Sequence, residues 1–215
     1  TRWEAQGLAT YTHRNFLGDL RKLQVHLQAG YAWIPTPFSP DQQGLVGRLT
    51  ASLDQPGTFG PRVDLASQVG GERSIEQGYA YWAVRARVGT PLRLATRWRL
   101  LPTYNIENYW VDAGFDPADG STPPQLQNCN ASRICLLSYF EQRITWDGRD
   151  DPVDTHRGLA AGLTVQEGFR IGSNGYDYIR VSPEASFYIP LGWRTVLAGR
   201  IRVGGLVPIN ETGPA

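Results

Sequence analysis

The sequence of 215 residues contains no methionine, only two cysteines and three histidines, and no long apolar run. No window approaches the roughly 18 consecutive apolar residues that a membrane-spanning helix needs, so helical membrane proteins are excluded. The 21 basic and 20 acidic residues give a net charge of +1, which offers no whole-chain basic surface for nucleic acid. Because the chain opens in mid-pattern at Thr1, without a signal peptide, we expect an internal fragment or a processed product.

Patterns for catalysis and metal binding are missing as well. The three histidines lie on separate segments, and no nucleophile elbow, phosphate loop or zinc spacing accompanies them: His13, His26 and His156. Four aspartates in one short segment invite a calcium site, but the glycine and ligand spacing of an EF-hand loop is absent: Asp147, Asp150, Asp151 and Asp154. We therefore predict that the protein is not an enzyme and binds no metal or cofactor.

Alternation of apolar and polar residues dominates the sequence. It is clearest over Leu23–Trp33, Leu92–Leu100 and Ile179–Ile189, where every second residue is predominantly apolar. Weaker versions occupy Trp3–Tyr11, Leu45–Leu53, Val63–Val69, Ala80–Val88, Leu136–Trp146, Leu159–Val165 and Thr195–Val203. The pattern predicts ten strands in one all-β, antiparallel domain over residues 1–215.

The connections between these strands differ in length. Tight turns are expected at Gly18-Asp19, Gly60-Pro61, Gly89-Thr90-Pro91 and Leu191-Gly192, with a somewhat longer one at Asp150–Gly158. Longer loops are expected at Pro35–Gly44, Gly70–Gly78, Asn105–Arg133 and Gly168–Gly175. Short turns on one side and long loops on the other are typical of an outer-membrane β-barrel, in which the short side is periplasmic.

Aromatic and basic residues support the barrel. Six aromatic residues lie near strand ends, where an interfacial girdle is expected: Tyr31, Trp33, Trp110, Trp146, Tyr188 and Trp193. Eight arginines would share the opposite face and form a basic, water-filled lumen: Arg85, Arg87, Arg93, Arg97, Arg99, Arg180, Arg200 and Arg202. The alternative is a soluble β-sandwich, in which the aromatic rings pack a core and the arginines line a solvated outside.

Two segments resemble turns of the BamA/TamA superfamily of outer-membrane assembly factors. The first matches the pattern N-x-x-G-x-x-R-x-L at Asn15, Gly18, Arg21 and Leu23, and the stretch Phe16–Leu23 resembles the TamA-like subgroup. The second resembles a periplasmic turn through Trp146, Asp147, Arg149, Asp150, Pro152 and Gly158. It departs from the family at Thr155, where a proline is common. Aspartate and arginine side chains that bond the turn backbone suffice to explain this segment structurally.

The resemblance implies a fold, a location and a function. The chain would correspond to strands two to eleven of a barrel of about sixteen, without the first strand, the closing strands or the periplasmic POTRA modules. It implies an integral protein of the bacterial outer membrane that helps assemble, insert or translocate other outer-membrane proteins without catalysis. Implied partners are the lipid bilayer, client proteins and periplasmic or membrane-anchored accessory subunits. Alternatives are a two-partner secretion pore and a passive channel that favours anions.

Cys129 and Cys135 lie in the longest expected loop, on the side that this topology assigns to the cell exterior. Export through the oxidising periplasm favours a disulfide between them. Two free thiols are the alternative.

Overall fold

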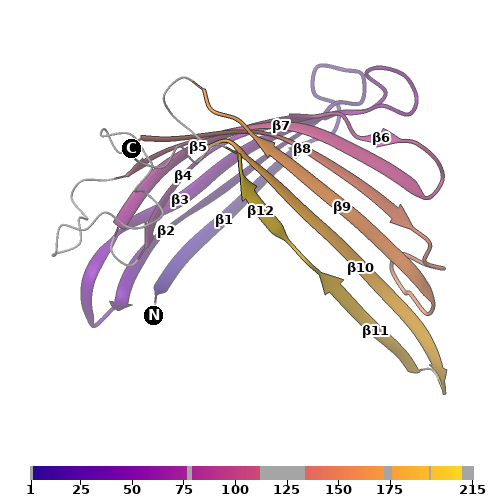
Figure 1. Ribbon diagram of the computed structural model, residues 1–215. Coiled ribbons are helices and arrows are strands. Elements are labelled where there is room, and N and C mark those ends of the chain that lie inside the picture. Colours follow the sequence, from indigo (N-terminus) through magenta and orange to yellow (C-terminus); the bar gives the residue numbers. More distant parts are fainter. Residues whose placement is uncertain (1, 77–78, 112–133, 172–175, 194, 210–215) are drawn as a thin grey trace.

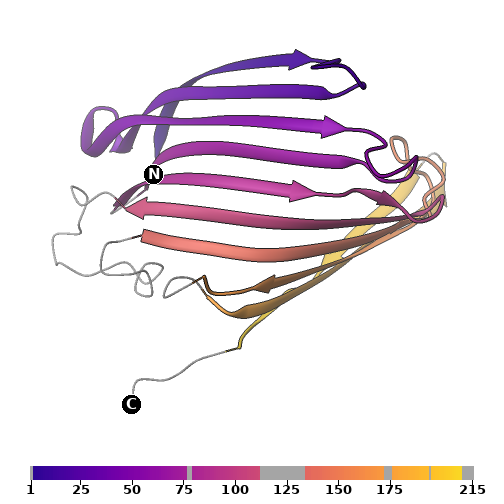
Figure 2. The same ribbon diagram turned by 90° about the horizontal axis from the view of Figure 1, so that it is seen from above.

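The computed structural model describes residues 2–76, 79–111, 134–171, 176–193 and 195–209, which form one antiparallel sheet. Its strands are β1 (Trp3–His13), β2 (Lys22–Thr36), β3 (Ser39–Gln55), β4 (Leu65–Glu76), β5 (Tyr79–Gly89), β6 (Leu92–Arg93), β7 (Trp98–Val111), β8 (Ile134–Asp147), β9 (Gly158–Gly168), β10 (Tyr178–Gly192), β11 (Thr195–Arg202) and β12 (Gly205–Pro208). Neighbours in sequence are neighbours in the sheet, which arches strongly and stays open between β1 and β11 (Figures 1 and 2). Among the described residues, no helix has the length and hydrophobicity to cross a membrane.

The short strands β6 and β12 continue the paths of β5 and β11. Each continuation follows a short break in the ladder, opposite a proline of the neighbouring strand. Val203 donates its N–H to the Pro183 carbonyl at 3.1 Å, but Pro183 has no N–H with which to return the bond. Thr90 likewise donates to the Pro102 carbonyl at 3.1 Å without a return bond. β11 with β12 and β5 with β6 keep one register across these breaks. The twelve strands therefore follow ten continuous paths. This is the number predicted, but β7 continues to Val111, through residues that were predicted as the start of the loop Asn105–Arg133.

The prediction of a strand over Leu92–Leu100 was wrong. β6 ends at Arg93, residues 94–97 form a turn, and Leu92 pairs with Leu100 across the hairpin. The predicted turn at Gly89-Thr90-Pro91 is instead the interruption within the strand. Arg93 and Arg99 form the last pair of this hairpin, with an odd number of residues, 94–98, between them. Paired residues share a face of the sheet, so the alternation continued unchanged through the reversal and concealed it.

The predicted alternation of loop lengths was right in part. The connections over 112–133 and 169–177 lie on the predicted side and are long, but the loops predicted at Pro35–Gly44 and Gly70–Gly78 were wrong. Strands β2 and β3 are joined only by Pro37 and Phe38, and β4 and β5 only by residues 77–78, whereas the opposite side carries connections over 14–21, 56–64 and 148–157. The strands extend past their apolar stretch as paired ribbons, because backbone hydrogen bonding does not require apolar side chains. The sidedness of the sheet thus stays a prediction that depends on the resemblance of the two turns.

The outer face of the sheet, defined as the face that carries Leu27, Leu49, Val69, Trp82 and Val84, is apolar and exposed. These five side chains are 47–53% exposed, and no second sheet covers them in the part of the chain that the structure describes. The largest buried apolar cluster is small: Ala32, Ile34, Val46, Ile75 and Ala80. A soluble sandwich would bury this face in a core, so the single sheet contradicts that alternative.

Candidate functional site

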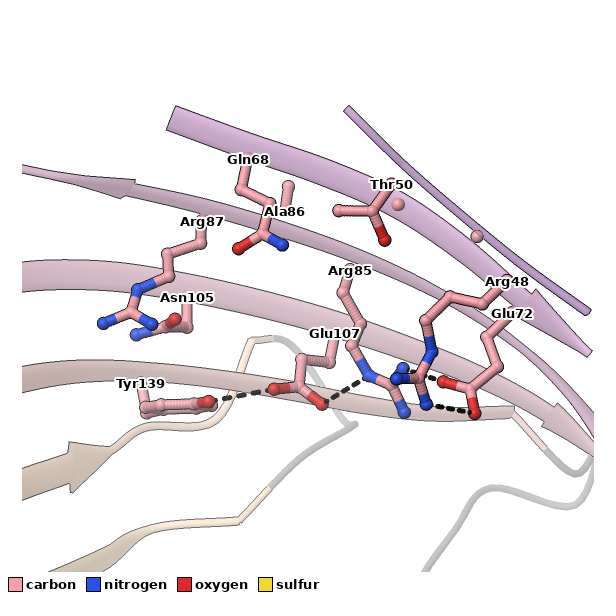
Figure 3. A pocket seen from close by; sticks show the side chains of 12 residues that line it. Arg48, Thr50, Gln68, Glu72, Arg85, Ala86, Arg87, Asn105, Glu107 and Tyr139 are labelled. Carbon is pink, nitrogen blue, oxygen red and sulfur yellow. Dashed lines mark hydrogen bonds and ion pairs between the residues drawn. The ribbon is translucent and has the colours of Figure 1, made fainter. Parts of the chain in front are cut away.

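The inner face of the sheet, opposite the apolar face, carries a network of charged side chains. Register places Arg85 of β5 opposite Glu107 of β7, and Arg48 of β3 opposite Glu72 of β4. Because side chains alternate along each strand, all four project to one side, as Figure 3 shows. They line a pocket of about 410 Å³ together with Gln68, Arg87, Asn105 and Tyr139, among others.

Glu72 is the most enclosed carboxylate of this pocket. It is only 9% exposed, its Oε1 accepts from Arg48 at 2.8 Å, and its Oε2 accepts from Arg85. A carboxylate removed from water is costly unless it is paired and hydrogen-bonded, and two guanidinium groups meet that need here. Glu72 therefore ties β3, β4 and β5 together.

Glu107 extends the network to β8. Its Oε2 accepts from Arg85 Nε at 3.3 Å and from the Tyr109 hydroxyl at 2.5 Å, while its Oε1 accepts from the Tyr139 hydroxyl at 2.9 Å. Arg85 thus lies between two carboxylates, and its guanidinium carbon lies 5.3 Å from the centre of the Tyr109 ring. Five neighbouring strands, β3, β4, β5, β7 and β8, are joined by one continuous polar chain (Figure 3).

Glu141 forms a second centre on the same face. It is 7% exposed and lies 3.4 Å from Arg87 and 4.0 Å from Arg143. Its other oxygen accepts from Gln166 of β9 at 2.6 Å. Sequence reasoning singled out Arg85 and Arg87 but overlooked the glutamates, although the same period-two pattern places them on this face. In this part of the sheet the inner face is ion-paired rather than simply basic.

The other predicted lumen-facing arginines are more exposed. Arg93 and Arg99 oppose each other across the β6–β7 hairpin, and Arg97 lies in its turn. Arg200 is paired with Glu184 at 2.7 Å. Register also places Arg180 and Arg202 on the inner face, where both are exposed. That this face lines a closed, water-filled lumen stays a prediction.

The turn that follows β8 is organised by its aspartates and Arg149. Arg149 donates to both oxygens of Asp147, at 2.9 and 2.7 Å, and to the Pro152 carbonyl at 3.4 Å. One oxygen of Asp150 accepts the N–H groups of Asp151, His156 and Arg157 at 3.0–3.2 Å. These bonds hold the pKa of Asp150 below its usual value of 3.8, the Arg157 N–H contributing most. Trp146, in the predicted motif, lies one residue before the end of β8.

Gly158 closes this turn in a conformation that favours glycine. Its φ is +125°, and a Cβ at this position would lie 2.6 Å from the Gly148 carbonyl oxygen and 2.7 Å from Arg149 Cα. The backbone of Gly158 therefore passes against the turn so closely that a side chain has no room. The carboxylates that suggested calcium are engaged with the turn itself, and no cluster among the described residues is arranged to hold a metal ion.

The first motif turn depends on left-handed backbone geometry. Residues 17–20 all have positive φ, between 54° and 83°. The Asn15 side chain accepts the Leu20 N–H at 3.1 Å, and Arg21 bonds Asp19 and, on β3, Gln55, both at 3.1 Å. Leu23, the last motif residue, begins the apolar alternation of the outer face. The motif thus sets a turn and anchors it to β3.

Residues suggested for other chemistry are dispersed. His26 shares a hydrogen bond with Thr10 at 3.1 Å, and His13 and His156 lie at separate turns. Cys135 is 8% exposed within β8, while Cys129 lies outside the described residues, so their disulfide stays a prediction. The absence of catalysis and of cofactors likewise stays a prediction.

Comparison with known proteins identifies the fold and the family. The structure is similar to the crystal structure of BamA from Haemophilus ducreyi lacking POTRA domains 1–3, with a TM-score of 0.60 and 11% sequence identity. The match covers 97% of this chain but only 41% of that one. Comparison with curated proteins gives no sequence match. The family model of the Omp85 superfamily domain matches residues 15–213. On this match, which spans nearly the whole sheet and both motif turns, the chain belongs to the Omp85 superfamily.

Proposed function

We propose that the chain is part of an integral outer-membrane β-barrel that assembles, inserts or translocates other outer-membrane proteins. The observation that carries the proposal is the Omp85 match over residues 15–213, on a curved sheet whose apolar face is exposed. Such work requires no catalytic side chain, because an unpaired strand edge can template a client strand through backbone hydrogen bonds. The partners would be the lipid bilayer, client proteins and accessory subunits in the periplasm or on the membrane.

The barrel would extend beyond this sequence. The described sheet ends at β1 and β11, and hydrocarbon does not tolerate the unpaired backbone of an open edge. We infer that further strands, from a longer chain or from other chains, cover both edges. The ten paths would be strands two to eleven of about sixteen, with the seam between the first and last strands outside this sequence.

The two motif turns support an orientation. If they are periplasmic, as the resemblance implies, Cys129 and Cys135 face the cell exterior and pass through an oxidising compartment on export. Intact cells should then bind an impermeant maleimide at both cysteines only after reduction. Labelling that also requires outer-membrane disruption would invert the orientation, and labelling without reductant would contradict the disulfide.

The function can be tested by reconstitution. The full-length protein that contains this chain, placed in liposomes, should accelerate insertion of a urea-unfolded outer-membrane barrel, measured as heat-modifiable, protease-protected product. Liposomes that contain a passive porin at equal mass control for bilayer defects. No acceleration over the porin would contradict an assembly function.

The same assay separates the alternatives. A two-partner secretion pore would deliver a soluble substrate into the liposome interior without inserting it. An anion-favouring channel would only conduct ions, with anions preferred in a salt gradient. The pairing of Arg48 and Arg85 with Glu72, and of Arg87 with Glu141, speaks against a uniformly basic lumen.

A further inference from the structure

The turn-side end of the inner face contains a second pocket, of about 1050 Å³. Four arginines from four segments line it: Arg62 from the connection over 56–64, Arg93 from β6, Arg99 from β7 and Arg143 from β8. Asp64 is the single carboxylate among its lining residues. With four cations and one anion, this pocket differs sharply from the ion-paired network deeper along the same strands.

These arginines are only weakly neutralised. Arg93 lies 3.5 Å from Asp64, and Arg143 lies 4.0 Å from Glu141, which is shared with Arg87. Arg143 also donates from Nε to the Thr164 hydroxyl at 3.2 Å. In the described part of the chain no carboxylate lies within 4 Å of the guanidinium group of Arg62 or Arg99, although Asp147 is close enough to interact electrostatically with Arg99. All four lining arginines are exposed. Their guanidinium groups are therefore available to a ligand from outside the sheet.

The register adds an unfavourable contact that a ligand would relieve. Arg93 and Arg99 stand directly opposite each other across the β6–β7 hairpin, and like charges in that position destabilise a sheet. Deeper along the inner face, the corresponding cross-strand positions pair Arg85 with Glu107 and Arg48 with Glu72. An anion held between Arg93 and Arg99 would restore the same balance at the turn side.

We propose that this pocket binds the carboxylate groups of an acidic polypeptide segment that reaches the inner face from the turn side. Guanidinium groups bind carboxylates through paired N–H donors, and several of them together recognise an acidic stretch. The volume is large for one small anion and admits several side chains. A lipid headgroup is disfavoured as the occupant because lipid contacts the outer face, whereas register places Arg93, Arg99 and Arg143 on the inner face.

Fluorescence anisotropy tests the proposal on the full-length protein in micelles, with labelled hexaglutamate as probe and hexaglutamine as the uncharged control. We expect hexaglutamate to bind, its affinity to fall with salt, and R93Q/R99Q to weaken it by about tenfold or more. The double variant R180Q/R202Q removes the same charge from another part of the inner face and should bind nearly as tightly as the unaltered protein. Equal losses in both variants, or no binding of hexaglutamate, would overturn the proposal.

Chemical protection and competition by a phosphate ligand test the site without relying on the folding of a variant. Hexaglutamate should protect Arg93 and Arg99 of the unaltered protein from phenylglyoxal, read by mass spectrometry, which does not depend on the folding of any variant. Tripolyphosphate should compete only at higher concentration than hexaglutamate. Competition at lower concentration would assign the pocket to phosphate groups instead, and unprotected arginines would refute the site.

Discussion

Arg48 and Glu72 stand directly opposite each other on β3 and β4, with Nη2 of the arginine 2.8 Å from Oε1 of the glutamate. The arginine side chain is 55% exposed, whereas that of the glutamate is 10% exposed. The carboxylate is therefore the buried member of the pair, and it accepts hydrogen bonds from both Arg48 and Arg85. Ion pairs of this kind can hold strands together on a face that has no apolar core.

Replacing Glu72 by glutamine should destabilise the barrel by about 1–3 kcal/mol, because two arginines lose their shared countercharge. The free energy of unfolding in urea, measured in bilayers, gives the value. Glu184→Gln makes the same chemical change in the more exposed Arg200–Glu184 pair of the inner face and should shift stability by less than about 1 kcal/mol. Equal shifts would mean that the network contributes nothing specific.

Adjacent positions on β2 test the facing of the sheet. Leu27 is 47% exposed on the outer face, and His26 is exposed on the inner face. Arginine at Leu27 should cost about 2–4 kcal/mol if the position lies near the bilayer midplane, whereas arginine at His26 should cost far less. The fraction folded in lipid vesicles across a urea series measures both. A larger cost at His26 would reverse the faces.

Alanine substitutions at Gly158 and Gly60 distinguish the cost of a steric clash from the cost of backbone strain. Both have a positive φ, +125° and +116°, but a Cβ at Gly60 meets nothing within 4 Å. Gly60→Ala should therefore cost about 1–3 kcal/mol from backbone strain alone. Gly158→Ala should cost clearly more, because it also meets the Gly148 carbonyl. Thermal unfolding followed by heat-modifiability compares the two, and similar losses would show that the close approach is unimportant.

The turn after β8 should respond to acid in a defined window. The pKa of Asp150 is lowered by the N–H groups that it accepts, chiefly that of Arg157. A depressed pKa means that the contribution of Asp150 is fully present above the unfolded value, near 3.8, and is lost as the pH falls through the lower folded value.

The amide protons of His156 and Arg157 report this directly, because both bond Asp150. The change in their NMR shifts that depends on Asp150 should occur only below about pH 4. Asp150→Ala should abolish the transition, while Asp154→Ala, whose carboxylate lies 3.8 Å from His156 Nε2, should preserve it. A transition centred above the usual aspartate value would contradict the bonding described here.

The sheet was predictable because alternation is local. Nine of the ten predicted strand ranges fall largely on strands of the structure, since a strand with one apolar and one polar face has period two whatever its neighbours are. The range Leu92–Leu100 failed because the odd number of residues between the paired Arg93 and Arg99 leaves that period undisturbed. The predicted ends of several strands were also wrong. Backbone pairing continues beyond the last apolar side chain, as in the β2–β3 hairpin, so the apolar pattern underestimates the length of the strand.

The all-β class, the two motif turns and most of the inner-face arginines could be recognised from local sequence pattern, because alternation and turn residues act between near neighbours in the chain. The partners of those arginines could not. Arg85 and Glu72 are thirteen positions apart and become partners through the register of β4 with β5. The same register leaves Arg93 facing Arg99. Because cross-strand pairing depends on where each hairpin turns, charge balance along the inner face emerges only when the sheet is assembled.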